Sequence, residues 1–221
     1  MPMLNMPGVG VYSLTDLAEE QLASRLGIPK KYYDKMKAEA PSLLATNANH
    51  WFCKGTDKYM VRTLDNKVRG FLSSRFRPLD NFDLAEVVLP ELNKVGLNVV
   101  SCEVTDRRMY LKAVTDKITA EITKGDVVQA GIVVSNSEVG CGSVKIEPMI
   151  YRLVCSNGMI ADDNSLRKYH VGRGDNEGDL REYFKTETRQ ADDKAFWMKV
   201  RDIVHSALGN GIFKNSVEKM K

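Results

Sequence analysis

The chemistry that this sequence suggests first comes from a cluster of basic residues between positions 58 and 77. This segment holds six Lys and Arg side chains and one acid, Asp65. The six are Lys58, Arg62, Lys67, Arg69, Arg75 and Arg77. Guanidinium groups bind phosphate oxygens in a bidentate manner, so such a cluster is typical of a site for a phosphate backbone.

The local pattern predicts that this segment forms a β-hairpin. Two runs of alternating residues, KYMVRTL and KVRGFLSS, flank Asp65-Asn66, which suits a two-residue type I′ turn. A regular hairpin would place Arg62 directly opposite Arg69, and like charges facing across two strands destabilise a sheet by up to about 1 kcal/mol. We therefore expect an anion to neutralise this face. The alternative is that acids from another strand or subunit pair with the arginines.

Aromatic residues lie among these cations, as they do in proteins that bind single strands. Tyr59 and Phe76 are candidates for stacking on bases, an interaction worth about 1–3 kcal/mol per base. The alternative is that both rings fill the core. Four further residues complete the predicted nucleic-acid site, the last three of them in a polar loop that could close over the ligand: Arg152, Lys168, His170 and Arg173.

Signatures of metal binding and catalysis are missing from the sequence. No Cys stands in a C-x-x-C pair and no His in an H-x-x-x-H pair, so we expect reduced thiols, no metal and no cofactor. The sequence also has no P-loop, dinucleotide-binding, nucleophile-elbow or zinc-protease motif. An enzyme with a pocket near Cys141, Cys155 and Glu138 stays open as an alternative, although Glu138 could equally mark a polar hairpin tip.

The periodicity of the chain predicts an α+β fold, with an antiparallel sheet of long hairpins packed against helices. Helical spacing in residues 13–25 and 30–40 predicts an N-terminal helical hairpin, which could also be a helix-turn-helix reading a major groove. Further helices are expected near 81–95 and 192–208, and a mobile polar loop between them. The segments expected are 1–50 (helical hairpin), 51–160 (core with the basic and the long hairpin), 161–190 (loop) and 191–221 (C-terminal helix).

Composition restricts the class of protein. The 221 residues are 43% hydrophobic and 28% charged, with a net charge of +3, which is ordinary for a globular chain. No apolar run approaches the roughly 18 residues that a membrane span needs, and the N-terminus lacks the pattern of a signal peptide. We expect no membrane partner and a cytoplasmic location.

Three long blocks carry a resemblance to a known family. NANHWFCKGTDKYMVRTLDNKVRGFLSSRFRPLDNFDL, GDVVQAGIVVSNSEVGCGSVKIEPMIYRLVCSNGM and RKYHVGR resemble the phage- and plasmid-borne family called domain of unknown function nine-three-two, over residues 14 to 175. The order of elements is also similar to the β-β-β-α core of single-strand annealing recombinases of the Rad-fifty-two and Red-beta kind.

That second similarity implies a function. It implies a phage or prophage protein that forms a ring or filament of identical subunits, holds single-stranded DNA in a basic groove and anneals complementary strands without ATP. A nuclease could act with it in the bacterial host cell. Two alternatives come from other classes of protein: a helix-turn-helix regulator that binds duplex DNA, and the small-molecule or nucleotide enzyme mentioned above.

Overall fold

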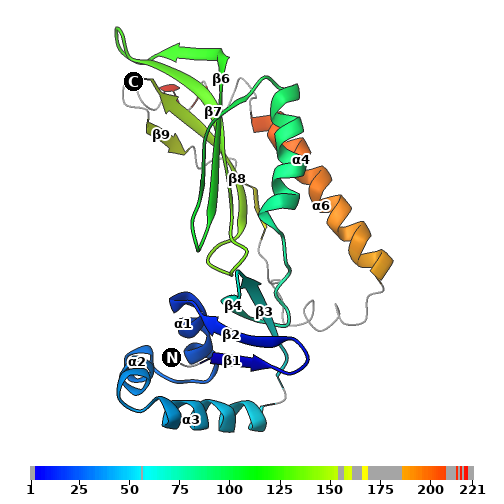
Figure 1. Cartoon of the computed structure of the whole chain (residues 1–221). Coiled ribbons are helices and arrows are strands. Elements are labelled where there is room, and N and C mark those ends of the chain that lie inside the picture. Colours follow the sequence, from blue (N-terminus) through cyan, green and yellow to red (C-terminus); the bar gives the residue numbers. More distant parts are fainter. Residues whose placement is uncertain are drawn as a thin grey trace. The chain divides into compact units, whose positions relative to one another are not determined.

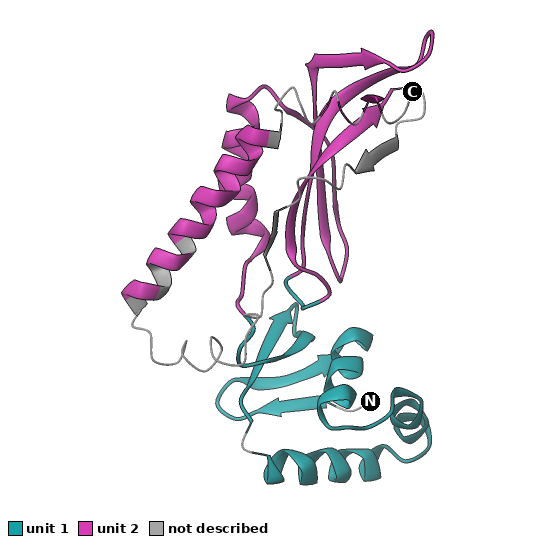
Figure 2. Cartoon of the chain, turned by 180° about the vertical axis from the view of Figure 1, so that it is seen from behind, with its two compact units in different colours: residues 1–76, 138–140 teal, residues 77–137, 141–221 magenta. Residues whose placement is uncertain are grey.

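The computed structural model describes residues 3–55, 57–153, 157–160, 166–168 and 186–207, together with positions 213, 215, 217 and 218. The chain has an α+β fold (Figure 1) and divides into two compact units (Figure 2). The first consists of Met1–Phe76 and Glu138–Gly140, and the second of Arg77–Ser137 and Cys141–Lys221. The two units do not test the four consecutive segments that the sequence predicts, because each unit combines parts that are distant in the chain. Those four segments stay a prediction.

The first unit is a four-stranded sheet with three helices. Its elements are β1 (Met3–Met6), β2 (Gly10–Leu14), α1 (Asp16–Arg25), α2 (Lys30–Glu39), α3 (Pro41–Lys54), β3 (Tyr59–Leu64) and β4 (Lys67–Ser73). The strands lie in the order β1-β2-β4-β3, and the pair β2 and β4 is parallel. Apolar residues from the helices pack with side chains of the sheet in one buried cluster: Leu22, Ala23, Ile28, Tyr33, Met36, Leu44 and Phe71.

The N-terminal helical hairpin is present only in part. Helices α1 and α2 follow one another as expected, but two strands precede them and a third helix follows them. Pro41, which directly follows the predicted helix over residues 30–40, begins α3, because proline fits the first turn of a helix without losing a hydrogen bond. The N-cap of α1 is Thr15, whose side chain accepts a hydrogen bond from Ala18 N at 3.3 Å.

The second unit is a six-stranded antiparallel sheet with two long helices. Its elements are α4 (Asn81–Lys94), β5 (Asn98–Val104), β6 (Met109–Glu121), β7 (Val127–Asn136), β8 (Val144–Arg152), β9 (Asn157–Ile160), β10 (Leu166–Lys168) and α6 (Thr186–Ala207). The strand order is β10-β8-β7-β6-β5, with β9 pairing β8 as well. The predicted hairpins β5–β6 and β7–β8 and the predicted helix α4 are confirmed, while α6 begins earlier than expected.

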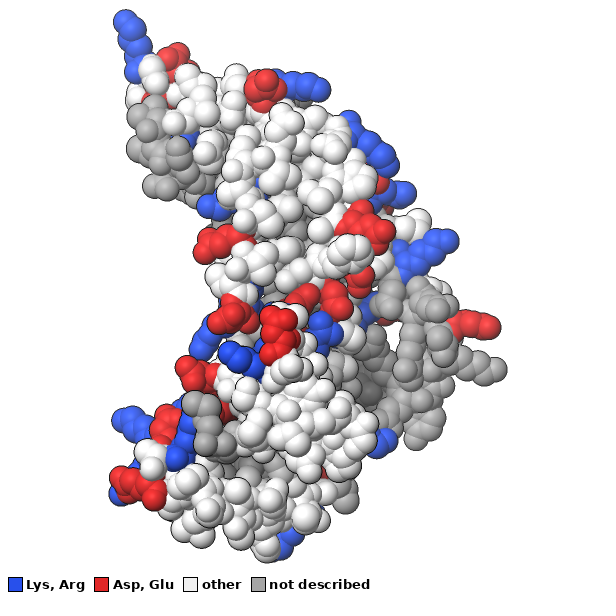
Figure 3. Space-filling model, viewed as in Figure 1, with Lys and Arg blue, Asp and Glu red and all other residues white. Residues whose placement is uncertain are grey.

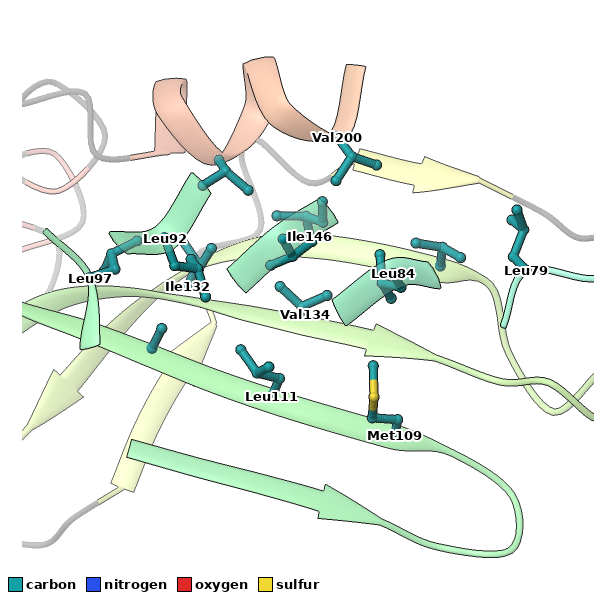
Figure 4. Packing of buried hydrophobic residues seen from close by; sticks show 14 of the residues in the cluster. Leu79, Leu84, Leu92, Leu97, Met109, Leu111, Ile132, Val134, Ile146 and Val200 are labelled. Carbon is teal, nitrogen blue, oxygen red and sulfur yellow. The ribbon is translucent and has the colours of Figure 1, made fainter. Parts of the chain in front are cut away.

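Helices α4 and α6 cover one face of this sheet (Figure 1), and alternate residues of the strands point into the core between them (Figure 4). The labelled side chains in Figure 4 are Leu79, Leu84, Leu92, Leu97, Met109, Leu111, Ile132, Val134, Ile146 and Val200. The backbones of β6 and β7 approach closely at Gly131, where an added Cβ would lie 2.5 Å from the carbonyl oxygen of Ala113. Within the described residues, no helix is both long enough and apolar enough to cross a membrane.

Candidate nucleic-acid interface

The basic hairpin exists as the sequence predicts. Strands β3 and β4 are antiparallel, and the two residues between them, Asp65 and Asn66, have φ angles of 49° and 58°. Positive φ at both central positions is what a type I′ turn requires, and Asp and Asn tolerate it better than most residues. The turn prediction is therefore confirmed.

The register of the hairpin differs from the prediction. The pairing shifts between Arg62 and Thr63, so Thr63 faces Val68 while Arg62 faces Gly70. Arg69 is left as the extra residue of a β-bulge. The expected placement of Arg62 directly opposite Arg69 is wrong, because a bulge inserts one residue and changes every pairing beyond it. Arg62 and Arg69 do not face each other, so their positions give no reason to expect an external anion.

Arg69 has an acidic partner within the same unit. Its Nη1 atom lies 2.9 Å from Oε2 of Glu138, and the two side chains are only 19% and 12% exposed. A partly buried charge needs a close counter-ion, and the carboxylate supplies it. The alternative reading of the sequence, in which acids from elsewhere in the chain pair with the arginines, thus holds for Arg69. We leave Arg69 out of the interface proposed below.

Arg77 belongs to the core of the second unit. It is 6% exposed, and its Nη1 atom lies 2.6 Å from Oδ2 of Asp192 on α6. The guanidinium group also lies over the ring of Phe196, 5.8 Å from the ring centroid. A guanidinium group with this little exposure has no surface for a phosphate backbone, so Arg77 is also left out.

The aromatic residues chosen for stacking are packed inside the first unit. Tyr59 contacts Phe71 and Phe52, with ring centroids 4.9 and 6.0 Å apart, and Phe76 is only 4% exposed. The buried ring of Phe76 offers no face to a base, and the ring of Tyr59 is partly buried against the apolar cluster. The alternative interpretation of the sequence, in which these rings fill the core, agrees with the burial of Phe76 and with the packing of Tyr59 against the apolar cluster.

Four cations of the hairpin segment remain at the surface. Lys58, Lys67 and Arg75 are exposed and Arg62 is partly exposed. The first unit contains 11 Lys and Arg against 8 Asp and Glu, whereas the second contains 21 of each, so the net charge of +3 belongs entirely to the first unit. On the face seen in Figure 3, the described basic residues are mixed with acidic ones.

The remaining predicted site residues lie outside this hairpin. Arg152 is 39% exposed and its Nη2 atom lies 3.1 Å from Oδ2 of Asp126. Lys168 is the last residue of β10, where it pairs with Val144 of β8, and its side chain is outside the described part of the chain. His170, Arg173 and most of the predicted 161–190 loop lie outside the described residues. The predicted closing of this loop over a ligand stays a prediction.

The polar block at residues 136–138 forms a hydrogen-bonded framework. Asn136 Nδ2 donates to the carbonyl oxygen of Leu79 at 2.7 Å and to Asn81 Oδ1 at 2.9 Å. Ser137 Oγ donates to the carbonyl oxygen of Arg107 at 2.7 Å and accepts from Cys141 N at 2.8 Å. These bonds satisfy the amide nitrogen of Asn136 and the hydroxyl of Ser137, whose side chains are almost completely buried, which is a structural role.

The alternative of an enzyme pocket in this region gains no support from these contacts. Glu138 is held by Arg69, and Cys155 is outside the described residues. In the described ranges, His, Cys, Asp and Glu side chains form no group of three that could hold a metal ion.

One important residue gave no signal in the sequence. Gln21 of α1 accepts a hydrogen bond from Phe71 N and donates one to the carbonyl oxygen of Val139, both at 2.7 Å. Val139 also packs against β4, since a Cβ added at Gly70 would lie 3.3 Å from its side chain. Gln21 thus fixes β4 and residues 138–140 to α1, a role that no local pattern reveals.

Comparison with known proteins assigns a domain to part of the chain. Residues 70–177 match the family described as "Domain of unknown function (DUF932)". The matched region is shorter than the resemblance stated from the sequence and begins within β4. No curated protein and no solved structure matches this chain.

Proposed function

We propose that this chain, which carries a DUF932 domain over residues 70–177, binds single-stranded DNA and anneals complementary strands without ATP. The observation that carries the proposal is the concentration of positive charge in the β3–β4 hairpin and its flanks. Exposed lysine and arginine side chains neutralise phosphates and release counter-ions, which supplies most of the affinity of non-specific DNA binding.

The exposed cations are spread along the hairpin. Lys58 and Arg75 lie at the end where β3 begins and β4 has ended, because Ser74 N donates to the carbonyl oxygen of Lys58 at 3.2 Å. Lys67 lies at the turn, at the other end of β3. A six-residue strand extends roughly 20 Å, so positive charges mark both ends of a ribbon along which a DNA strand can lie.

The residues assigned to the interface differ from those expected from the sequence. Lys58, Arg62, Lys67 and Arg75 contact phosphates in this proposal, and Arg69, Arg77, Tyr59 and Phe76 have internal roles instead. Arg152 and the loop residues Lys168, His170 and Arg173 stay in the proposal as additional contacts.

Annealing by a ring or filament also requires self-association, and strand β5 supports this part of the proposal. Strand β5 lies at the edge of the large sheet, and all seven of its residues are exposed. Val99, Val100 and Val104 are 44%, 45% and 62% exposed. An unprotected edge strand with apolar side chains is a template for a strand of another chain.

The test of DNA binding is a fluorescence-anisotropy titration with a labelled oligo(dT) at several salt concentrations. We expect affinity to fall with salt, with a log–log slope of about −0.7 per neutralised phosphate. The variants Lys67→Ala and Arg75→Ala should each reduce the slope by about 0.7, while Lys124→Ala, an exposed lysine of the second unit, serves as the matched control. A response that does not change with salt would refute the proposal.

The same assay separates the two competing functions. Duplex DNA in place of oligo(dT) tests the helix-turn-helix alternative, which predicts a duplex preference that is lost in Lys31→Ala and Tyr32→Ala on the exposed side of α2. Deletion of residues 1–50 is unsuitable, because these residues supply most of the apolar cluster of the first unit. Annealing is measured directly by mixing complementary labelled strands without ATP, and a nucleotide thermal-shift screen tests for an enzyme.

A further inference from the structure

Trp51, in the last turn of α3, is an exposed aromatic residue with cationic neighbours. The side chain is 47% exposed. Lys54 Nζ lies 5.4 Å from the centroid of the indole ring, and the ring of His50 meets it edge-on at 5.5 Å. The next residue, Phe52, packs on Tyr59 and Phe71 beside the apolar cluster of the unit. The helix therefore carries one aromatic ring for the core and one for the surface.

Trp51 lies at the same end of the first unit as two cations of the basic hairpin. The contact between Phe52 and Tyr59 places the C-terminal turn of α3 beside the start of β3. Lys58 directly precedes β3, and its carbonyl oxygen accepts from Ser74 N, which places it next to Arg75. Residues 54–58 contain two lysines, Lys54 and Lys58, and one acid, Asp57, and Arg75 adds a third positive charge at this end of the hairpin.

An indole ring beside cations is the chemistry that single-strand binders use. Every base has a π-face, so a ring can stack on it without reading sequence, while neighbouring lysines contact the phosphates. Of the stacking residues expected from the sequence, Phe76 is buried and Tyr59 is partly buried against Phe71 and Phe52, so both rings are less exposed than that of Trp51. Within the described residues of the first unit, Trp51 supplies an exposed ring beside the cations of the proposed interface.

We propose that Trp51 stacks on a base of single-stranded DNA, with Lys54, Lys58 and Arg75 on the adjoining phosphates. This inference rests on the proposed function and names the residue that recognises the base. Removal of one stacking ring should weaken binding about 5- to 150-fold. The salt dependence should not change, because no charge is removed.

The chain offers a direct spectroscopic test, since it has only two tryptophans. Trp197 packs beside Phe196 on α6, with ring centroids 4.8 Å apart, and Trp197→Phe leaves Trp51 as the only indole. Titration of this variant with oligo(dT) should quench the remaining tryptophan fluorescence. Trp51→Ala should lower affinity by the factor given above at an unchanged salt slope, and Trp51→Phe should restore part of it. Tyr32→Ala, which removes an aromatic residue that is 49% exposed on α2, is the matched control.

The outcomes distinguish this inference from the proposed function. If oligo(dT) binds with the expected salt slope but Trp51→Ala binds equally well and Trp51 fluorescence does not change, the inference fails while the proposed function stands. If no single strand binds the unaltered protein, both fail. If Trp51→Ala changes self-association but not DNA affinity, the residue belongs to a protein contact and the inference fails.

Discussion

Arg69 Nη1 and Glu138 Oε2 lie 2.9 Å apart, although 69 positions separate the two residues in the sequence. Arg69 is the extra residue of the β-bulge in β4, and Glu138 belongs to the short segment that the first unit takes from the tip of the β7–β8 hairpin. This ion pair neutralises a guanidinium group that the sequence alone assigns to DNA. The positive charge available to a ligand is therefore smaller than the sequence suggests.

The ion pair should stabilise the fold and contribute little to DNA binding. We expect Glu138→Ala to lower the free energy of unfolding by about 2–3 kcal/mol, because it leaves Arg69 partly buried without its counter-ion. Urea denaturation of Arg69→Ala, Glu138→Ala and the double variant measures the coupling. Lys67→Ala, on the exposed end of the same strand, should leave stability unchanged and serves as control. A coupling energy near zero would contradict this role.

Gln21→Ala should destabilise the protein by about 2 kcal/mol, because it leaves the backbone N–H of Phe71 and the carbonyl of Val139 without their partner. Gln21→Glu keeps the acceptor for Phe71 but turns a carboxylate oxygen toward a carbonyl oxygen, so it should not restore stability at neutral pH. Ser24→Ala, at an exposed position of the same helix, is the control. Urea midpoints equal to that of the unaltered protein would show that the bridge is dispensable.

Glu91 of α4 should make stability depend on pH. Hydrogen bonds from Lys94 and His205 hold the pKa of this carboxyl below its ordinary value of about 4.5. A depressed pKa favours the folded state above the unfolded-state pKa, and this contribution is lost as the pH falls through the folded-state pKa. The difference in thermal stability between the unaltered protein and Glu91→Gln should thus be full at pH 6–7 and should shrink as the pH falls below about 4.5. Glu86→Gln, which removes a carboxylate at an exposed position of the same helix, is the control.

Self-association through β5 makes a separate prediction. Replacing Val100 and Val104 with Lys should produce smaller species in sedimentation velocity, because charges on an edge strand oppose pairing with another chain. Folding should be little affected, since both side chains are exposed. Val9→Lys, at a position of the first unit that is 67% exposed, is the matched control. Identical sedimentation of the β5 variant and the unaltered protein would exclude this edge as the interface.

The sequence by itself determined the elements whose signals are local. Asp65 and Asn66 specify their turn because few residue pairs accept positive φ, and apolar periodicity located α4 and the long hairpins. These features depend on neighbours within a few positions, which a reader of the sequence can see. The excess of charge at residues 58–77 was visible for the same reason.

Only the tertiary structure decided which of these residues can meet a ligand. Because of the bulge, Arg62 does not face Arg69. Glu138 forms an ion pair with Arg69, and Asp192 forms one with Arg77. Phe76 is buried by packing, whereas Trp51 is exposed at the surface. Arg77 and its partner Asp192 are 115 positions apart. Periodicity says which side of a strand a residue occupies, but burial and ion pairing depend on what packs against that side, and those groups come from distant parts of the chain.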